Sequence, residues 1–570
     1  MPITFFIILR MKQINKISMK LHHKVIAIVL LCLTLTGSVG YVSILDKTHD
    51  NYFQISKNID IFGKIYRQIN EHYVDDIEPN EFIRIGIDAM LKSLDPYTNY
   101  IPQNEIEDYQ FLTTGQYGGI GAIVSQRDKK IIVTEPYEGS PAHKNDIRVG
   151  DQIIGVNGKT TMGLKVDEVR NLLRGQAGTE VTIEIIRHGQ VITKTFKREE
   201  IKVKNVRYAG MVNEEVGYLT LSSFTQDAAQ EVKDAVINLK KQGAKKLILD
   251  LRGNPGGLLN QAIMISNLFI NKGETIVSTK GKQEVSNRTY TAENTPLDLD
   301  IPIAVLVNEN SASASEIVSG VIQDLDRGVV VGQRTYGKGL VQNTLPLSYG
   351  AQIKITTAKY YTPSGRCIQK LDYSHKTNGK ATVIPDSMKK AFKTRNQRTV
   401  YDGGGILPDI EVKSEEYPEI LQSLIGYNVI FDFVVKYRET HDKISNAKDF
   451  EVDDNIYNEF VKFAMDKNFS YNTPLQSKLK EFKKLAEKDK RFMPIIQSDI
   501  ESIENKIKSD KSVDMQVYKK EIKEFLSLEF AFHYYLESGR IQQSFKHDAE
   551  ILEAVKVLKN PAKYNQILKK

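Results

Sequence analysis

Apolar positions change their spacing along the chain, and each change predicts a different kind of structure. Isoleucines recur at four-residue steps from Ile61 to Ile69, which indicates a helix within residues 46–112. That segment ends in a loop rich in turn formers, SLDPYTNYIP. Residues 113–200 then alternate apolar and polar positions in short runs separated by glycine turns, and Asn157 with Gly158 predicts a hairpin there. The pattern therefore predicts a small helical domain followed by a compact β-rich module.

From residue 201 to about residue 415 the two periods alternate. Apolar strands such as KLILDL and IPIAVLV are separated by stretches with an apolar residue every three or four positions. Strands that alternate with helices predict βαβ units around a parallel sheet. Residues 416–570 are rich in Lys and Glu and carry helical stripes with few strand signals, which predicts a helical carboxy-terminal domain. The predicted fold class is therefore multidomain α/β.

Composition excludes some functional classes. Hydrophobic residues make up 41% and charged residues 26% of the 570, a mixture typical of globular domains rather than of disordered or polytopic membrane chains. The net charge of +7 would fit nucleic-acid binding if it were clustered on one domain. Five of those charges instead lie in residues 1–24, which contain no acid. We therefore expect no nucleic-acid partner.

An uncharged apolar run spans residues 25–45. It contains 21 residues, and at about 1.5 Å per residue its helix would be about 30 Å long, enough to cross a bilayer. The basic residues before it predict that the amino terminus lies in the cytoplasm and that the chain after this run is exported to the periplasm or cell envelope. Residues 1–45 are thus predicted to anchor the protein in the inner membrane. A cleaved signal peptide is the alternative, since Ser38 and Gly40 suit a cleavage site.

A serine-rich segment, NENSASASEI, directly follows a predicted buried strand. The apolar stripe that comes next places the start of a helix near Ser313, and Glu316 three residues later completes a capping-box pattern. One interpretation is that Ser313 only caps the helix, because serine is among the commonest N-caps. The other is that Ser313 is a nucleophile, since free amides and the positive end of a helix stabilise an oxyanion.

A serine nucleophile needs a base, and Lys338 in the segment YGKGLVQ is the candidate. No histidine lies between His188 and His375, so a local histidine is excluded. Only about one lysine in 2,500 is neutral at pH 7, so such a base must be desolvated. An ordinary surface lysine between two turn glycines is the alternative interpretation.

Metal and nucleotide chemistry have little support in the sequence. The segment GQRTYGKG resembles a phosphate-binding loop, but Gly339 stands where Ser or Thr would hold magnesium. There is no HExxH motif, and Cys32 and Cys367 do not form a paired-cysteine zinc motif. We expect no metal and no organic cofactor.

Four segments in this order resemble the carboxy-terminal processing proteases, or tail-specific proteases, of the S41 serine peptidase family. They are SLDPYTNYIP, LILDLRGNPGGLL, SASASEI and TYGKGLVQ, within residues 60–415. The resemblance implies a ClpP/crotonase-like α/β protease core with a PDZ domain and helical amino- and carboxy-terminal domains. The implied boundaries are 1–45 for the signal or anchor, 46–112 for the helical domain, 113–200 for the PDZ domain, 201–415 for the catalytic domain and 416–570 for the helical carboxy-terminal domain.

The same resemblance implies a catalytic site. Ser313 corresponds to the family's nucleophile, Lys338 to its general base 25 residues later, and Gln342 to the residue that orients the lysine. A straight strand would hold Lys338 and Gln342 about 13 Å apart, so we expect a turn or bulge at Gly339. The implied oxyanion amides are those of Ala314 and of Gly256 or Gly257.

For the PDZ-like module, the resemblance implies a peptide groove. The amides of a glycine-flanked loop would bind a peptide's terminal carboxylate, the next strand would pair with the peptide backbone, and a helix would form the second wall. The loop residues are Gly119, Ile120 and Gly121, and the helix residues are Val166, Val169 and Leu173.

Together these features predict a serine endopeptidase of the cell envelope. It would bind protein substrates by their carboxy-terminal tails and cut through an acyl-enzyme. A homo-oligomer or an adaptor protein is a possible further partner. The alternatives are a non-catalytic envelope scaffold that binds protein tails, and an acyl-CoA-processing enzyme on a related α/β core, for which a PDZ-like module would have no use.

Overall fold

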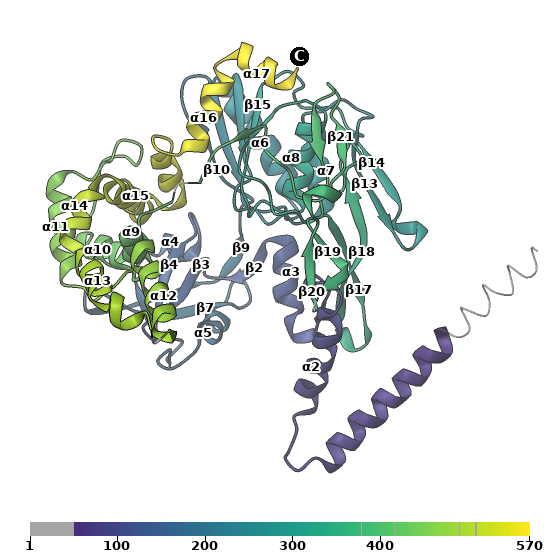
Figure 1. The fold of residues 1–570 in the computed structure, drawn as a ribbon, viewed down its shortest axis with the longest axis horizontal. Coiled ribbons are helices and arrows are strands. Elements are labelled where there is room, and N and C mark those ends of the chain that lie inside the picture. The colour runs from purple at the N-terminus through teal and green to yellow at the C-terminus, as the bar shows by residue number, and fades with distance from the viewer. Residues whose placement is uncertain (1–50, 378, 415, 490, 508–509, 570) are drawn as a thin grey trace, which may run out of the picture. The chain divides into compact units, whose positions relative to one another are not determined.

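The computed structural model describes most of the chain after the amino-terminal segment. It separates into two compact units, Met1–Leu91 and Lys92–Lys570 (Figure 1). The residues described are 51–377, 379–414, 416–489, 491–507 and 510–569.

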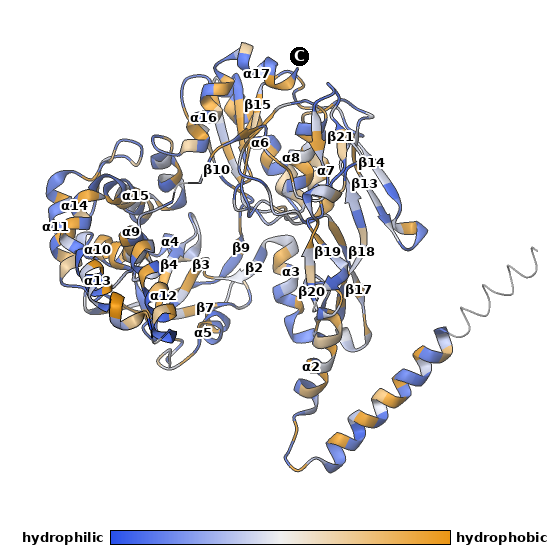
Figure 2. Ribbon diagram, in the orientation of Figure 1, coloured by the Kyte–Doolittle hydropathy of each residue, from blue (hydrophilic) through white to orange (hydrophobic). Residues whose placement is uncertain are grey.

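The first unit is helical where it is described. A helix covers residues 51–72, and α2 (Pro79–Lys92) follows it. Hydrophobic and hydrophilic residues alternate along the first helix (Figure 2), and Ile65 is 53% exposed. The predicted helix is therefore confirmed. The apolar run at residues 25–45 lies outside the described residues, and no helix within them is both long and apolar enough to span a membrane.

The β-rich module is an antiparallel sheet with strand order β3-β4-β5-β7-β8. The predicted hairpin at Asn157 and Gly158 joins β5 to β6 (Lys159–Thr160), and both turn residues have positive φ, 51° and 75°, as a type I′ turn requires. The short pair β2 (Gln116–Gly119) and β9 (Glu199–Lys202) closes the module. Its remaining elements are β3 (Ala122–Arg127), β4 (Lys130–Pro136), α4 (Pro141–Lys144), β5 (Gln152–Val156), α5 (Val166–Leu173), β7 (Glu180–Arg187) and β8 (Gln190–Lys197).

A six-stranded sheet forms the centre of the part of the chain that the resemblance predicts to be catalytic. All of its neighbouring strands are parallel except the first pair, β10 and β11, so the predicted βαβ alternation is confirmed. Its strands, in spatial order, are β10 (Val206–Met211), β11 (Val216–Leu221), β12 (Lys246–Asp250), β15 (Ile303–Val307), β16 (Val329–Gly332) and β23 (Ile410–Glu411).

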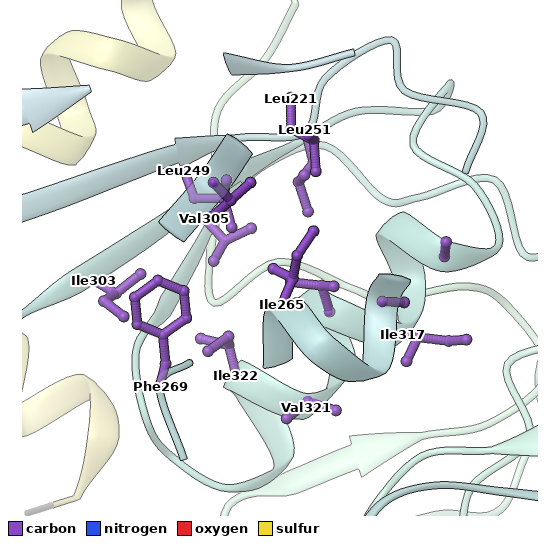
Figure 3. Packing of buried hydrophobic residues seen from close by; sticks show 14 of the residues in the cluster. Leu221, Leu249, Leu251, Ile265, Phe269, Ile303, Val305, Ile317, Val321 and Ile322 are labelled. Carbon is purple, nitrogen blue, oxygen red and sulfur yellow. The ribbon is translucent and has the colours of Figure 1, made fainter. Parts of the chain in front are cut away.

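Three helices pack their apolar residues against one face of this sheet: α6 (Ala228–Lys241), α7 (Leu259–Asn267) and α8 (Ala314–Asp324). Figure 3 shows Leu249 and Val305 of the sheet close to Ile265 of α7. All three side chains are almost fully buried. This packing fixes the position of α8, whose N-cap residue is Ser313.

The opposite face of the sheet is covered by the end of the chain. Helices α16 (Ala549–Leu558) and α17 (Pro561–Leu568) bury Ile551 and Val557 against residues that include Tyr218 and Leu306. Parallel strands are apolar on both faces, so this face needs a second layer. These two helices lie within the predicted carboxy-terminal domain, residues 416–570, and they form this second layer.

A second, five-stranded sheet shares a core with α7 and α8 through residues such as Ile276 and Tyr360, and the loop SLDPYTNYIP contributes a strand to it. Strand β1 (Asn99–Ile101), within SLDPYTNYIP, pairs with β18 (Gln352–Tyr361), so this loop belongs to the catalytic part rather than to the helical domain before it. The polar stretch 370–405 forms two hairpins, β19–β20 and β21–β22. The other elements are α3 (Ile106–Thr114), β13 (Thr275–Gly281), β14 (Arg288–Thr291), β17 (Leu340–Pro346), β19 (Leu371–Thr377), β20 (Lys380–Val383), β21 (Ala391–Lys393) and β22 (Thr399–Tyr401).

A helical carboxy-terminal domain is confirmed before α16. It has its own aromatic core, in which Phe433, Phe460 and Phe530 are buried together. Its helices are α9 (Glu419–Gly426), α10 (Val429–Tyr437), α11 (Asp454–Met465), α12 (Pro474–Lys488), α13 (Met493–Lys506), α14 (Lys511–Val517) and α15 (Lys519–Ser544).

Candidate active site

Ser313 lies at the turn between β15 and α8, in a backbone conformation that residues other than glycine rarely adopt. Its φ is 55° and its ψ is −110°. Gly256 packs closely against this turn: a Cβ atom there would lie 3.0 Å from the Cβ of Ser313 and 2.7 Å from the carbonyl oxygen of Ala312. A strained, tightly packed serine is typical of a functional site, where surrounding packing holds the backbone in place.

Lys338 lies in the loop between β16 and β17 and is partly buried. Burial is the main reason that its pKa is lowered to about 8, and the nearby cation of Lys354 lowers it further, whereas Glu316 and Asp95 raise it. Its Nζ lies 4.4 Å from the centre of the Tyr97 ring, which comes from the amino-terminal loop. The desolvation that a lysine base requires is therefore present.

Glu316 connects the backbones of Ser313 and Lys338. Its Oε2 accepts hydrogen bonds from the backbone nitrogens of Ser313 at 2.8 Å and Lys338 at 2.9 Å. Its Oε1 accepts from the backbone nitrogen of Gly337 at 2.7 Å and the hydroxyl of Thr335 at 2.6 Å. Because one oxygen binds both backbones, the two segments lie side by side although 25 residues separate them in the sequence.

The burial of Glu316 is complete. It raises the pKa of the carboxyl to about 7, against the opposing effect of its hydrogen bonds. In the sequence, Glu316 was predicted only as the third residue of a capping box, so its bonds to the lysine segment were missed. The motif S-x-x-E was the available signal, but nothing in the sequence indicated which other chain segment the carboxylate would reach.

Gln342 lies on β17 and bonds to a threonine in the structure. Its Nε2 donates to the hydroxyl of Thr356 at 3.1 Å. The predicted bulge is present, but between Val341 and Gln342 rather than at Gly339. The backbone nitrogen of Gly339 donates a hydrogen bond to Gln369 Oε1 at 2.7 Å.

The predicted oxyanion amides differ in their hydrogen bonding. The backbone nitrogen of Gly256 donates to Asn254 Oδ1 at 2.9 Å, so it is already engaged. The amides of Ala314 and Gly257 donate to no acceptor among the residues that the structure describes. Gly257 is also held close to Phe224, since a Cβ atom at Gly257 would lie 2.5 Å from the Phe224 carbonyl oxygen.

The other two serines of the segment, Ser311 and Ser315, both bond to backbone carbonyls. Ser311 Oγ donates to the carbonyl of Leu251 at 2.8 Å, and Ser315 Oγ donates to the carbonyl of Asn254 at 2.9 Å. These bonds join the segment that carries Ser313 to the turn RGNPGG. The same turn is attached to α16, because Arg252 pairs with Asp548 and Glu550, each at 2.9 Å.

The β-rich module has a cavity of about 210 Å³ between β3 and α5. Ile120 and Leu173, both predicted groove residues, line it. Gly119 and Gly121 flank Ile120 in the loop before β3, and a hydrogen bond joins the backbone of Gly121 to the Tyr117 hydroxyl. The full lining is Phe111, Tyr117, Ile120, Ala122, Ile123, Val124, Tyr137, Arg170, Leu173 and Arg174.

The helix wall of this cavity differs from the prediction at two positions. Val169 is fully buried in the core of the module, and Val166 packs against that core, so neither lines the cavity. Residues three or four apart share one face of a helix, and here that face meets the sheet. Arg170 and Arg174 form the wall together with Leu173.

Nothing in the described part of the chain resembles a metal centre. No group of three or more His, Cys, Asp and Glu side chains is arranged there to hold a metal ion.

Comparison with known proteins agrees with this architecture. Residues 215–376 match peptidase family S41, residues 132–187 match a PDZ domain, and residues 420–558 match the C-terminal helical domain described for a probable PDZ-protease. Fold, site and matches together define a serine-type peptidase with a PDZ domain.

Similar proteins specify the branch of the family. A probable CtpA-like serine protease of Staphylococcus aureus (strain MRSA252) is 35% identical over 68% of this chain and 80% of its own length. The carboxy-terminal processing protease CtpA of Bacillus subtilis (strain 168) is 33% identical over 74% and 87%. The chain therefore belongs to the carboxy-terminal processing proteases of family S41. The solved photosystem II D1 C-terminal processing protease is 25% identical over 62% of this chain and 92% of its own, with a TM-score of 0.32.

Proposed function

We propose that this protein is an endopeptidase of the cell envelope that recognises the carboxy-terminal tails of proteins and cuts them with Ser313 and Lys338. The observation that carries the proposal is the buried Glu316 carboxylate, whose single Oε2 atom binds the backbones of both residues. A scaffold that only bound tails would not need a strained serine next to a desolvated lysine.

The pKa of Lys338 suits the base that this chemistry needs. With a pKa of about 8, about a tenth of the lysine is neutral at pH 7, about two hundred times more than for an ordinary lysine. Neutral Lys338 takes the proton from Ser313 Oγ as this oxygen attacks the peptide carbonyl. The protonated lysine then gives the proton to the leaving amine, and an acyl-enzyme remains.

The second half of the reaction reverses these roles. Lys338 takes a proton from a water molecule, which attacks the acyl carbon, and Ser313 Oγ leaves with the proton that the lysine returns. In both halves negative charge develops on the carbonyl oxygen. The unpaired amides of Ala314 and Gly257 are the donors best suited to stabilise it, because the Gly256 amide is engaged by Asn254.

Tail recognition would take place in the cavity of the PDZ module. A peptide would add as a strand to β3, and its carboxylate would meet the loop that contains Gly119, Ile120 and Gly121. The carboxylate would replace the Tyr117 hydroxyl as partner of the Gly121 backbone. The relative named carboxy-terminal processing protease supports this choice of substrate.

The proposed location in the cell envelope rests on the sequence of residues 1–45. Their basic start and uncharged run support export of the body and retention in the membrane. Mass spectrometry of the protein extracted from membranes tests this: an intact amino terminus supports the anchor, and a shortened one supports cleavage of a signal peptide.

The catalytic assignment is tested with the full chain in detergent, wild type beside Ser313→Ala. Two reporter proteins are supplied that differ only in an apolar or a lysine-rich carboxy-terminal tail. We expect cleavage by the wild type alone and of the apolar-tailed reporter alone. Equal cleavage by the folded Ser313→Ala variant would contradict the nucleophile, and equal cleavage of both reporters would contradict tail recognition.

A further inference from the structure

The peptide cavity of the PDZ module combines an apolar floor with a positively charged wall. Its floor and β3 side are apolar or aromatic, whereas helix α5 and the residue after it contribute the guanidinium groups of Arg170 and Arg174. None of the residues that line the cavity is acidic. A bound tail would therefore meet two cations and no anion from the cavity itself.

Arg174 lies at the end of the cavity that receives the peptide terminus. A Cβ atom on Gly119, in the predicted carboxylate loop, would lie 3.7 Å from the Cα of Arg174. The Nε of Arg174 is buried and has no hydrogen-bond partner among the described residues. The guanidinium also lies 5.3 Å from the centre of the Tyr117 ring. This arginine thus lines a partly apolar site and keeps a buried donor without a partner.

Arg170 lies one helical turn before Arg174, which corresponds to about 5.4 Å along α5. A peptide strand advances about 3.3 Å per residue, so this distance spans roughly two residues of a bound tail. Side chains two apart point to the same face of a strand. The last residue of a tail and the third from last would therefore both face α5, the latter opposite Arg170.

The acids that now pair with these arginines are exposed and easily exchanged. Asp108 pairs with Arg174 and is 63% exposed, and Asp167 pairs with Arg170 at 2.9 Å and is 74% exposed. Ion pairs at such positions stabilise proteins only weakly. Glu135 on β4 is partly buried and faces Arg207 at 3.6 Å instead. A carboxylate on a ligand could thus replace either partner at little cost.

We propose that this groove selects protein tails that end in an apolar residue and carry Asp or Glu at the third position from the end, where the acid pairs with Arg170 and Arg174. This proposal rests on the proposed tail recognition and adds the class of tail that the protease selects. The apolar floor at Ile120 and Leu173 accounts for the last residue, and the arginine wall accounts for the acid.

The test measures binding of short labelled peptides to the full chain with Ser313→Ala, which prevents cleavage. The peptides share an apolar last residue and differ only at the third position from the end, which is Glu, Ala or Lys. We expect the Glu peptide to bind about five- to tenfold more tightly than the Lys peptide, with Ala between them. The difference should shrink in high salt, because partly exposed pairs are screened.

Charge variants identify the residues responsible. Arg170→Gln and Arg174→Gln should each reduce the preference for Glu, and Arg170→Glu should reverse it toward Lys while binding of the Ala peptide persists. Lys159→Gln makes a comparable change of charge on the exposed β5–β6 hairpin, outside the lining, and should leave the preference unchanged.

The outcomes separate this proposal from the function on which it rests. Equal affinity for all three peptides, with an amidated terminus abolishing binding, would overturn the acidic preference and leave tail recognition intact. Absence of binding by every peptide, or equal binding of amidated peptides, would overturn tail recognition and the acidic preference with it.

Discussion

At the scale of single residues, the site depends on how neighbouring charges set the pKa of one lysine. Burial lowers the pKa of Lys338, and Lys354 on β18 lowers it further by electrostatic repulsion. A cation near a lysine base is a known way to favour its neutral form. The charge on Lys354 is thus expected to assist a reaction in which it takes no direct part.

Lys354→Met should therefore raise the pKa of Lys338, because it removes a positive charge while keeping most of the side-chain volume. Less neutral lysine would be present at pH 7, and the acid limb of the profile of kcat/KM against pH should move upward by about half a unit or more. Lys359→Met is the matched control, since Lys359 lies on the same strand but is exposed. An unchanged profile in the Lys354 variant would show that the charge of Lys354 does not alter the pKa of Lys338.

Glu316 gives a prediction about stability. The pKa of Glu316 in the folded state, about 7, is raised above the ordinary value. The contribution of this carboxyl to folding stability is therefore fully present only below about pH 4.5. This stabilisation is lost as pH rises through 7. The free energy of unfolding of the wild type relative to Glu316→Gln should thus fall by the order of 3 kcal/mol between these two pH values. Denaturant titrations at both pH values measure it.

The same variant should also lose activity, because an amide nitrogen cannot accept the bonds that an oxygen of Glu316 accepts. The distance between Ser313 and Lys338 would then no longer be held. A Glu316→Gln protein with full kcat/KM and a pH-independent stability difference would contradict both roles.

At the scale of elements, the bulge in β17 decides where Gln342 points. The extra residue between Val341 and Gln342 changes the register against β18 and brings the amide to Thr356. A β-bulge redirects the side chains that follow it. The side chain of Gln342 is thus held against β18, which fits the orienting role that we propose for it better than an exchange of protons.

Lys338→Ala should abolish turnover while the protein stays folded, because no other group near Ser313 is expected to act as base. Gln342→Ala should reduce kcat by a smaller factor, about tenfold to a hundredfold, since it removes orientation alone. Turnover of a reporter protein, with circular dichroism as a check of folding, compares the two. A loss as deep for Gln342→Ala as for Lys338→Ala would contradict the ranking.

At the scale of the whole molecule, the carboxy-terminal end is part of the catalytic layers. Helix α16 packs on the sheet opposite α8, and acids at its start pair with Arg252, the first residue of the turn RGNPGG. The chain therefore has to be complete before this sheet is covered on both faces. The stability of the catalytic part and the integrity of α16 should be linked.

Ile551→Ala should destabilise the catalytic part by about 2–4 kcal/mol, because it leaves a cavity under a fully buried side chain. Leu552→Ala on the same helix is the control: Leu552 is 46% exposed, so its replacement should cost far less. Thermal unfolding followed together with proteolytic activity measures both effects. Equal stability of the two variants would mean that α16 does not stabilise the sheet.

Local patterns were enough to predict much of this protein. The alternation of strands and helices, the hairpin at Asn157 and Gly158, and the start of a helix at Ser313 were all predicted from neighbouring residues, because local periodicity and turn chemistry determine them. The family was recognised from four short motifs in order. The candidates Ser313 and Lys338 followed from those motifs.

Only the tertiary structure decided which distant segments meet. Three features depend on long-range contacts. Glu316 bonds to the backbone of Lys338, Arg170 and Arg174 line the PDZ cavity where Val169 was predicted to do so, and α16 packs on the catalytic sheet. A single sequence specifies which side of each element is apolar. It does not specify which other element covers that side, because many partners satisfy the same pattern and only packing in three dimensions selects among them.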